Sequence, residues 1–205
     1  MSVDYKGLFE PVRSSHSYPI SVALLPAMGQ EVEFRDPRIE QIEISNNRMV
    51  PSFLTVQRGD SVEFINRDRV FHQIFSLSQD QPLAVQLDRS GALGKDRMAI
   101  KLERPGTTHF FCRIHNKSYA RVDVVESPHL QTIQPGQTFH FSGIAPGLWK
   151  LRLASPAAET RLVDVSALTA PPPLDLTLAS HAGGSGIDRI DPGAGAELLY
   201  QKQNR

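Results

Sequence analysis

The chain has 205 residues, and its 22 Lys and Arg residues balance its 22 Asp and Glu residues, so the formal net charge at pH 7 is zero. This length is enough for one large domain or two small ones, each with its own hydrophobic core. The balanced charge excludes the basic surface used for nucleic acids or anionic membranes, and the single cysteine excludes an internal disulfide bond.

The first 29 residues lack a basic segment followed by a long apolar run, and no later stretch stays apolar long enough to span a bilayer. We therefore expect a soluble chain. It is either cytoplasmic or has a signal that was removed or never included. Residues 1–17 are expected to form an N-terminal extension.

Short segments rich in β-branched and aromatic residues, separated by Gly, Pro, Asn and Asp, predict strands. Within SVEFIN, Val62 and Phe64 alternate with Glu63, as in a half-buried antiparallel strand. Residues 80–97 lack clear periodicity and predict a long loop. The spacing of the strands is typical of a β-sandwich or barrel. The segments in this half are residues 20–26, 31–35, 53–57, 61–66, 98–103, 108–112 and 120–126.

The strand pattern restarts after Pro128, which predicts a smaller second β-module. Its strand-like segments are residues 138–143, 148–153, 160–166 and 171–179. The remaining residues, 180–205, are rich in Gly and polar side chains and predict a mostly disordered tail. Within it, AELLYQK is expected to form at most a short helix or a docking segment.

Cys112 ends an aromatic run, and His115 follows it three residues later. A thiolate and an imidazole at this spacing can form a soft metal site, a nucleophile with its base, or two core residues. His72 lies forty residues before Cys112, a separation typical of two strands that meet across a sandwich. One thiolate and two imidazoles form a His₂Cys set that suits copper. Zinc would usually take a fourth protein ligand or a water.

Two stretches resemble the cupredoxin (plastocyanin-like) family: FLTVQRGDSVEFINRDRVFHQIFS at residues 53–76 and FCRIH at residues 111–115. More narrowly, they resemble the bacterial plastocyanin-like proteins of the methylamine utilization group. In that group a transthyretin-like, or carboxypeptidase-regulatory-like, β-domain follows the cupredoxin domain, and SGIAPGLWKLRL is similar to a strand-turn-strand of that module. The resemblance covers roughly residues 18–178.

The resemblance implies an all-β fold: a cupredoxin-like Greek-key β-sandwich at residues 18–127, followed by a smaller β-sandwich module at 128–179. It implies that His72, Cys112 and His115 bind one copper ion in a mononuclear site. The implied function is electron transfer or copper handling, not enzyme catalysis, with a redox or copper-donor protein as partner. The implied compartment is the periplasm, with the cytoplasm as the alternative.

The sequence departs from the family pattern Cys-x-x-His-x-x-Met, because Ser118 occupies the position of the axial methionine. No methionine follows Cys112 in the chain. A blue-copper axial bond is long and weak, so its loss leaves the His₂Cys set in place and alters the redox potential and the exposure of the metal. The same departure keeps open a second hypothesis, a metal-free cupredoxin-fold binding or scaffold protein.

A third hypothesis, a Cys-His enzyme, requires an activated Cys112 and an oxyanion hole, and the sequence shows no third group that would orient the base. Trp149 is expected to be a core or interdomain residue. His109 is expected to face away from Cys112 on its strand. Five histidines receive no ligand role: His16, His109, His129, His140 and His181.

Overall fold

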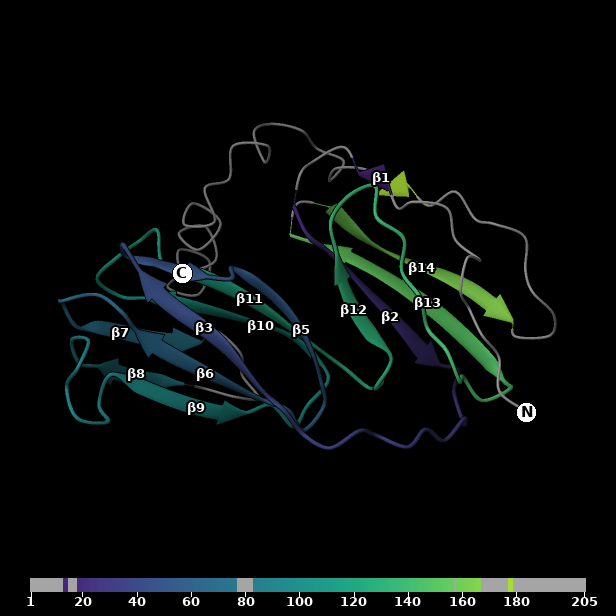
Figure 1. Cartoon of the computed structure of the whole chain (residues 1–205), viewed down its shortest axis with the longest axis horizontal. Coiled ribbons are helices and arrows are strands. Elements are labelled where there is room, and N and C mark those ends of the chain that lie inside the picture. The colour runs from purple at the N-terminus through teal and green to yellow at the C-terminus, as the bar shows by residue number, and fades with distance from the viewer. Residues whose placement is uncertain (1–12, 15–17, 77–82, 157, 167–176, 179–205) are drawn as a thin grey trace, which may run out of the picture. The chain divides into compact units, whose positions relative to one another are not determined.

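The structure is a computed structural model that describes residues 13–14, 18–76, 83–156, 158–166 and 177–178. Every regular element in these ranges is a strand, so the expected all-β class is confirmed (Figure 1). The chain divides into two compact units. The described residues of the central unit lie in Asp36–Val124, and those of the flanking unit lie in Met1–Arg35 and Val125–Asp188.

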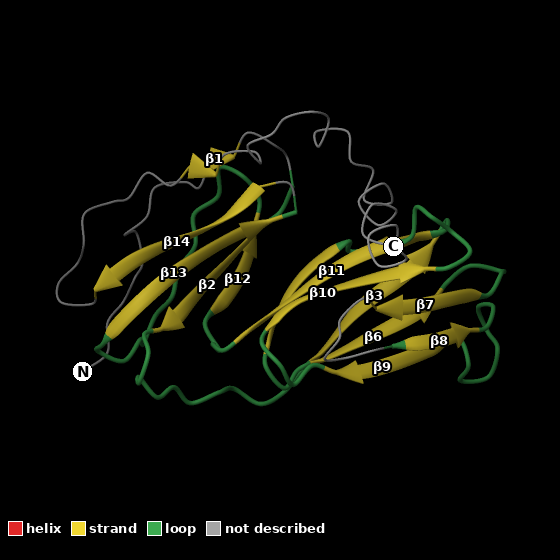
Figure 2. Ribbon diagram, turned by 180° about the vertical axis from the view of Figure 1, so that it is seen from behind, coloured by secondary structure: helices red, strands yellow, loops and turns green. Residues whose placement is uncertain are grey.

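The central unit contains two sheets (Figure 2). In the four-stranded sheet the order is β4-β3-β6-β9, and β3 and β6 run parallel. In the five-stranded sheet the order is β5-β11-β10-β7-β8. The strands are β3 (Ile39–Ser45), β4 (Arg48–Val50), β5 (Phe53–Gln57), β6 (Ser61–Asn66), β7 (His72–Ser76), β8 (Ala84–Leu87), β9 (Arg97–Lys101), β10 (Gly106–Cys112) and β11 (Tyr119–Val125).

Both sheets of the central unit bury side chains in one shared core, which makes the unit a β-sandwich. Phe64 of β6 and Phe110 of β10 come from different sheets, and their ring centroids lie 4.9 Å apart. Val62 and Phe64 are fully buried while Glu63 is half-buried, so the predicted alternation in SVEFIN is confirmed. The expected antiparallel pairing holds only toward β9, because β6 runs parallel to β3. Each large apolar side chain buried in this way contributes roughly 1.5–3 kcal/mol to folding.

The flanking unit is built on one four-stranded sheet of order β12-β2-β13-β14. One face of this sheet carries an apolar core that includes Trp149, so this residue is a core residue of the unit. Arg13–Ser14 (β1) and Thr177–Leu178 (β15) add a short parallel pair. The four strands of the sheet are β2 (Ile20–Pro26), β12 (Leu130–Ile133), β13 (Leu148–Ser155) and β14 (Ala158–Ser166).

The division into units differs from the expected domain boundaries, because β2 belongs to the flanking sheet and not to the sandwich that follows it in sequence. Ile20–Pro26 pairs with β12 on one side and β13 on the other. Five of its residues in a row are buried, the pattern of a strand covered on both faces. Such a run shows that a strand is central, but it does not show which sheet contains it.

Two segments with strand-like alternation form no strand. Residues 31–35 are not assigned to a strand, although Val32 packs against the flanking core. In residues 138–143, Phe139 and Phe141 are buried, but the backbone of His140 bonds to the side-chain amide of Gln131. Burial of alternate aromatic side chains therefore does not by itself require a neighbouring strand.

The predicted loop at 80–97 contains a strand, because Ala84–Leu87 pairs with β7 as β8. Residues 1–12, most of the predicted segment 171–179, and the tail 180–205 lie outside the described residues. The described part of the chain holds no helix with the length and hydropathy needed to cross a membrane.

Candidate metal centre

The three histidine and cysteine side chains singled out from the sequence meet at one end of the central sandwich. His72 begins β7 and Cys112 ends β10, and these strands pair antiparallel with Cys112 opposite Ile74. Because side chains on one strand face alternate sides, His72 points to the same face as Ile74 and therefore toward Cys112.

A tight turn after β10 returns His115 to Cys112. The backbone N–H of Ser118 donates to the carbonyl of His115 at 2.9 Å, and the N–H of Cys112 donates to the carbonyl of Ser118 at 3.1 Å. These two bonds close the turn between β10 and β11 and fix the position of His115 in it.

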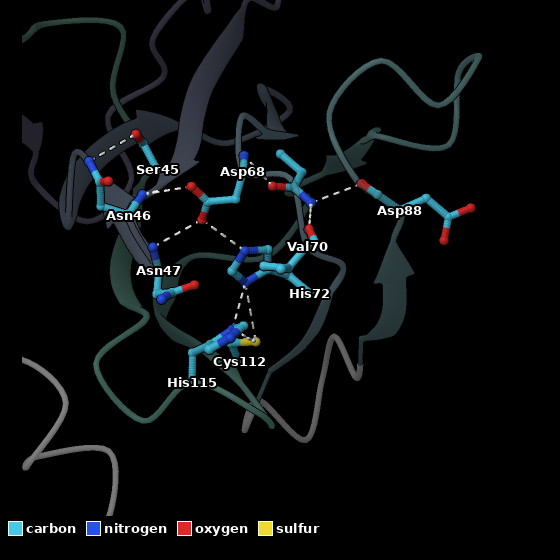
Figure 3. Close-up of polar contacts among 10 residues, drawn as sticks. Ser45, Asn46, Asn47, Asp68, Val70, His72, Asp88, Cys112 and His115 are labelled. Carbon is cyan, nitrogen blue, oxygen red and sulfur yellow. Dashed lines mark hydrogen bonds and ion pairs between the residues drawn. The ribbon is translucent and has the colours of Figure 1, made fainter.

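The ligand atoms converge closely (Figure 3). The Sγ atom of Cys112 lies 3.6 Å from Nδ1 of His72 and 3.6 Å from Nδ1 of His115, and the two Nδ1 atoms lie 3.0 Å apart. A circle through these three atoms has a radius of about 2.0 Å, which is close to the metal–nitrogen and metal–sulfur distances of about 2.0–2.3 Å at protein zinc sites. The donors thus surround a point at bonding distance from all three.

Two of the three donor side chains are buried. The side chain of His72 is fully buried and Cys112 is 5% exposed, while His115 is half-buried. Access to the donors therefore runs past His115.

Asp68 fixes the tautomer of His72. Its carboxylate Oδ2 lies 3.0 Å from Nε2 of His72, on the ring edge opposite Cys112 (Figure 3). A carboxylate can only accept, so Nε2 carries the proton and Nδ1 presents its lone pair to Cys112 and His115. A carboxylate behind a histidine in this way is a common feature of protein metal sites.

A β-turn holds Asp68 in place. Asn46 and Asn47 link β3 to β4 with positive φ angles of 52° and 60°, as a two-residue hairpin turn requires. Their backbone N–H groups donate to Oδ1 and Oδ2 of Asp68 at 2.7 and 2.9 Å. Burial alone would raise the pKa of Asp68, but these two N–H groups and His72 outweigh it and hold that pKa below its ordinary value.

The electrostatics keep His72 neutral. Burial lowers the pKa of His72, Asp68 opposes this effect, and the neighbouring His115 adds to it, so the result lies below the ordinary value of 6.5. At neutral pH the imidazole therefore carries no proton on Nδ1, the atom that faces Cys112.

Asn66 secures the segment that leads to His72. Its side-chain amide donates to the carbonyl of Val70 at 2.7 Å and to that of Asp88 at 2.8 Å, and its Oδ1 accepts from the N–H of Asp68 at 2.8 Å. The two donated bonds and the accepted one hold the turn between β6 and β7 and tie it to Asp88, which follows β8.

Ser118, at the position of the expected methionine, is only 1% exposed, and its Oγ has no hydrogen-bond partner among the residues that the structure describes. A buried hydroxyl without a partner is uncommon in proteins and costs about 1–3 kcal/mol. Its backbone closes the turn over the site.

The other histidines are placed apart from the three donors where they are described. His109 faces away from Cys112, as expected, and its Nδ1 lies 2.9 Å from the hydroxyl of Tyr119. His129 packs edge-on against Trp149 in the flanking unit, and His140 lies in the same unit. His16 and His181 lie outside the described residues.

The residues that hold His72 and the turn before it, Asp68 and Asn66, were not predicted from the sequence. Asp68 lies four residues before His72 and Asn66 six residues before it, yet neither spacing by itself distinguishes a ligand's partner from an ordinary loop residue. The Asn46-Asn47 pair is a recognisable hairpin signal, but its contact with Asp68 depends on the register of β3. The Cys-His hypothesis considered His115 as the base of Cys112, whereas the structure places Asp68 behind His72, so that Asp68, His72 and Cys112 form an Asp-His-Cys series.

Searches against known proteins yield structural likenesses only. No family model matches the chain, and no curated protein matches it. A purple cupredoxin from Nitrosopumilus maritimus is 22% identical, with a TM-score of 0.35 over 42% of this chain and 98% of its own.

Two further solved structures show likeness of the same order. A copper-containing nitrite reductase from Thermus scotoductus is 21% identical, with a TM-score of 0.38 over 49% of this chain and 25% of its own. An amicyanin from Paracoccus versutus is 14% identical, with a TM-score of 0.36 over 49% of this chain and 90% of its own.

Proposed function

We propose that His72, Cys112 and His115 bind one copper ion, and that the protein is a cupredoxin-like electron carrier or copper-handling protein. The observation that carries this proposal is the convergence of two Nδ1 atoms and one Sγ atom within 3.6 Å of one another. A thiolate with two imidazoles is a soft donor set that suits copper and is characteristic of blue-copper sites.

The donor set matches the charge and tautomer that copper requires. One thiolate and two neutral imidazoles carry a single negative charge, which offsets part of the charge of either copper state. Asp68 already directs the lone pair of His72 to the site, so no rotation or proton transfer at His72 precedes binding. A bound copper ion would supply one-electron chemistry by cycling between Cu(I) and Cu(II).

The residues around the donors favour transfer of an electron over reaction with a substrate. His72 and Cys112 are buried, and backbone hydrogen bonds close the turn that carries His115. A ligand set held in this way changes little between oxidation states, which suits electron transfer. The half-buried His115 is the donor nearest to solvent and therefore the expected point of electron entry.

No methionine follows Cys112 in the chain, and we propose that Ser118, at the position of the expected methionine, leaves the donor set without a thioether. If water stays out, loss of this soft donor should raise the reduction potential. If the Oγ of Ser118 instead binds a water, the thiolate-to-copper absorption of the loaded protein should weaken or shift.

The Asp68-His72-Cys112 series also resembles the triad of a cysteine hydrolase, but its surroundings do not favour that reaction. A nucleophile must reach the substrate, whereas Cys112 is 5% exposed and its proposed base is fully buried. A triad also leaves no role for His115, whose Nδ1 lies 3.0 Å from that of His72. The absence of enzyme activity remains a prediction.

The domain assignment and compartment are part of the same proposal. We infer that the sandwich of the central unit is the cupredoxin-like domain, and that the sheet formed by β2, β12, β13 and β14 is the transthyretin-like module of the methylamine utilization group. Copper sites of this family lie outside the cytoplasm, so the proposed compartment is the periplasm. Fractionation of cells that express the native full-length product tests it, and retention in the cytosol would contradict it.

Copper titration tests the function. Metal-free protein at micromolar concentration is titrated with Cu(II) and, under reducing conditions, with Cu(I), and is followed by absorption and EPR spectroscopy. We expect one ion per chain and an intense thiolate-to-copper band that Cys112→Ser abolishes. Ser118→Met should move the spectrum toward that of a blue-copper site. A folded wild-type protein that binds copper in neither oxidation state would establish the metal-free scaffold alternative.

A further inference from the structure

A groove of about 500 Å³ lies beside the candidate metal centre. One wall is the turn before β7, with Arg69, Val70 and Phe71, and Phe71 immediately precedes His72. The other wall is the loop after β8, which contributes Arg89 and Ala92. The groove is therefore part of the same end of the sandwich as the three donors.

Two exposed apolar side chains line the groove. Val70 and Phe71 leave 48% and 45% of their surfaces accessible, whereas Phe64 of β6 and Ile74 of β7 are buried. Adjacent exposed apolar side chains at the mouth of a groove are more typical of a binding surface than of a free surface.

Two cationic side chains line the groove together with Val70 and Phe71. Arg69 and Arg89 are exposed, and neither forms an ion pair within the described part of the chain. The one carboxylate in the lining, Asp88, accepts a hydrogen bond from Gln86 at 3.1 Å. The walls thus carry a net positive charge, although the whole chain is neutral.

The two walls are tied together, so the groove is preformed. The buried amide of Asn66 donates to the carbonyl of Val70 on one wall and to that of Asp88 on the other. The N–H of Ser90 donates to the carbonyl of Asp68 at 2.8 Å. Because the carboxylate of Asp68 also bonds to His72, the groove and the metal centre share one hydrogen-bonded support.

We propose that this groove docks an acidic partner protein, whose carboxylates pair with Arg69 and Arg89 and whose apolar side chain contacts Val70 and Phe71. Charge complementarity selects this partner, because exposed guanidinium groups pair with carboxylates and steer an anionic surface to the groove. Combined with the proposed function, on which this part rests, the partner is a redox or copper-donor protein that docks at the same end of the sandwich as the three donors.

The first experiment needs no copper. Amide resonances of the metal-free, ¹⁵N-labelled full chain are followed while hexacyanochromate(III), an inert paramagnetic anion, is added, and in a separate series while the acidic soluble domain of cytochrome b5 is added. We expect line broadening and shifts concentrated at residues 69–71 and 88–92 in both series. The double variant Arg69→Glu/Arg89→Glu should abolish both responses.

Lys101→Glu is the matched control. Lys101 pairs with Ser61 at the start of β6, whereas the groove lies beyond Asn66 at the other end of that strand. This charge reversal should leave both series unchanged. Broadening spread over all cationic surfaces, or a response that survives the double variant, would overturn the proposal. A single-stranded oligonucleotide that displaces cytochrome b5 from the same amides would overturn it in favour of a nucleic-acid partner.

The second experiment uses the copper-loaded protein and compares electron transfer with acidic cytochrome b5 and with basic cytochrome c. Double charge reversal should slow the reaction with cytochrome b5 by about tenfold at low salt, since steering of this kind changes association rates by 10-fold or more. The reaction with cytochrome c should not slow. Equal slowing with both proteins would show that the arginines act on the metal centre and not on docking. If copper does not bind, the proposed function fails, and the first experiment still decides whether the groove docks an acidic partner.

Discussion

Two histidines in different units show how similar residues come to have different roles. Burial lowers the pKa of both His72 in the central unit and His129 in the flanking unit. His129 packs edge-on against Trp149 and Phe141, with ring centroids 5.6 and 6.3 Å away. His72 instead contacts Asp68 with one ring nitrogen and Cys112 with the other.

The difference lies in what the ring nitrogens meet. His129 contributes the flat faces and edges of its ring to a core of aromatic side chains, which is a packing role. His72 uses both nitrogens in directed contacts, and one of them faces two further soft donors. Burial of a histidine is therefore uninformative about function until the partners of its two nitrogens are known.

The largest expected effect is a loss of stability confined to one unit when a core side chain of that unit is truncated. Leu151 and Ile42 are fully buried, in the flanking and central cores respectively. Replacing either by Ala should cost about 2–5 kcal/mol, because it removes buried methyl groups and leaves a cavity. Urea unfolding should show the loss for Leu151→Ala in the fluorescence of Trp149, the only tryptophan, and for Ile42→Ala in the far-UV signal of the central unit. If either variant lowers both transitions equally, the two units unfold as one cooperative unit, which would contradict the prediction of separate effects.

Copper should stabilise only the central unit. A ligand that binds the folded state alone adds about 2.7 kcal/mol when its free concentration is 100 times its dissociation constant. The urea transition of the central unit should therefore move to higher denaturant on addition of copper, while the transition of Trp149 stays in place. Cys112→Ser is the control, because Ser keeps the size of this buried side chain but not its thiolate. A copper-induced shift that persists in this variant would contradict the assigned ligand set.

Asp68→Asn should weaken copper binding by about 10- to 100-fold, which is about 1.4–2.7 kcal/mol. Both carboxylate oxygens of Asp68 accept hydrogen bonds. The Asn side chain replaces one of these oxygens with an N–H₂ group, which cannot accept, so at least one of the bonds is lost. The measurements are copper affinity and the EPR hyperfine splitting, which a change in the orientation of His72 should alter. Asp164→Asn, at an exposed carboxylate of the flanking unit, should alter neither. Unchanged affinity in Asp68→Asn would show that the tautomer of His72 needs no carboxylate.

The smallest expected effect is a difference in acid sensitivity. Burial lowers the pKa of His109, and the charge of Arg121 adds to this effect, while burial alone lowers the pKa of His129. For such groups the unfolded chain takes up the proton first as the pH falls. The stability that the neutral histidine contributes is therefore fully present above its ordinary pKa of 6.5, and it is lost as the pH falls toward the lowered pKa of the folded protein. The effect is small because each histidine takes up at most one proton on unfolding.

The test uses His109→Gln and His129→Gln in the copper-loaded protein, with unfolding followed between pH 8 and pH 5. His109→Gln should flatten the pH dependence of the central unit only, and His129→Gln that of the flanking unit only. A variant that flattens neither transition would contradict the assigned pKa direction for its histidine.

Sequence alone determined the all-β class, part of the strand pattern and the chemical types at the site, whereas β3, β4, β7, β8 and β12 were not predicted. Strand-forming composition predicted an all-β chain, and period-two alternation correctly placed Val62 and Phe64 inside, because alternation along a strand depends only on local backbone geometry. The three side chains that the structure brings together, His72, Cys112 and His115, were also identified from residue type, spacing and resemblance.

The tertiary structure decided what depends on pairing between distant segments. It assigned Ile20–Pro26 to the flanking sheet, because a uniformly apolar strand fits any sheet that covers both its faces. It also placed Asp68 between His72 and the Asn46-Asn47 turn, a contact set by the parallel register of β3 and β6. Strand composition indicates that a strand forms, whereas its neighbours depend on the whole chain, since the hydrogen bonds of a sheet are the same for every sequence.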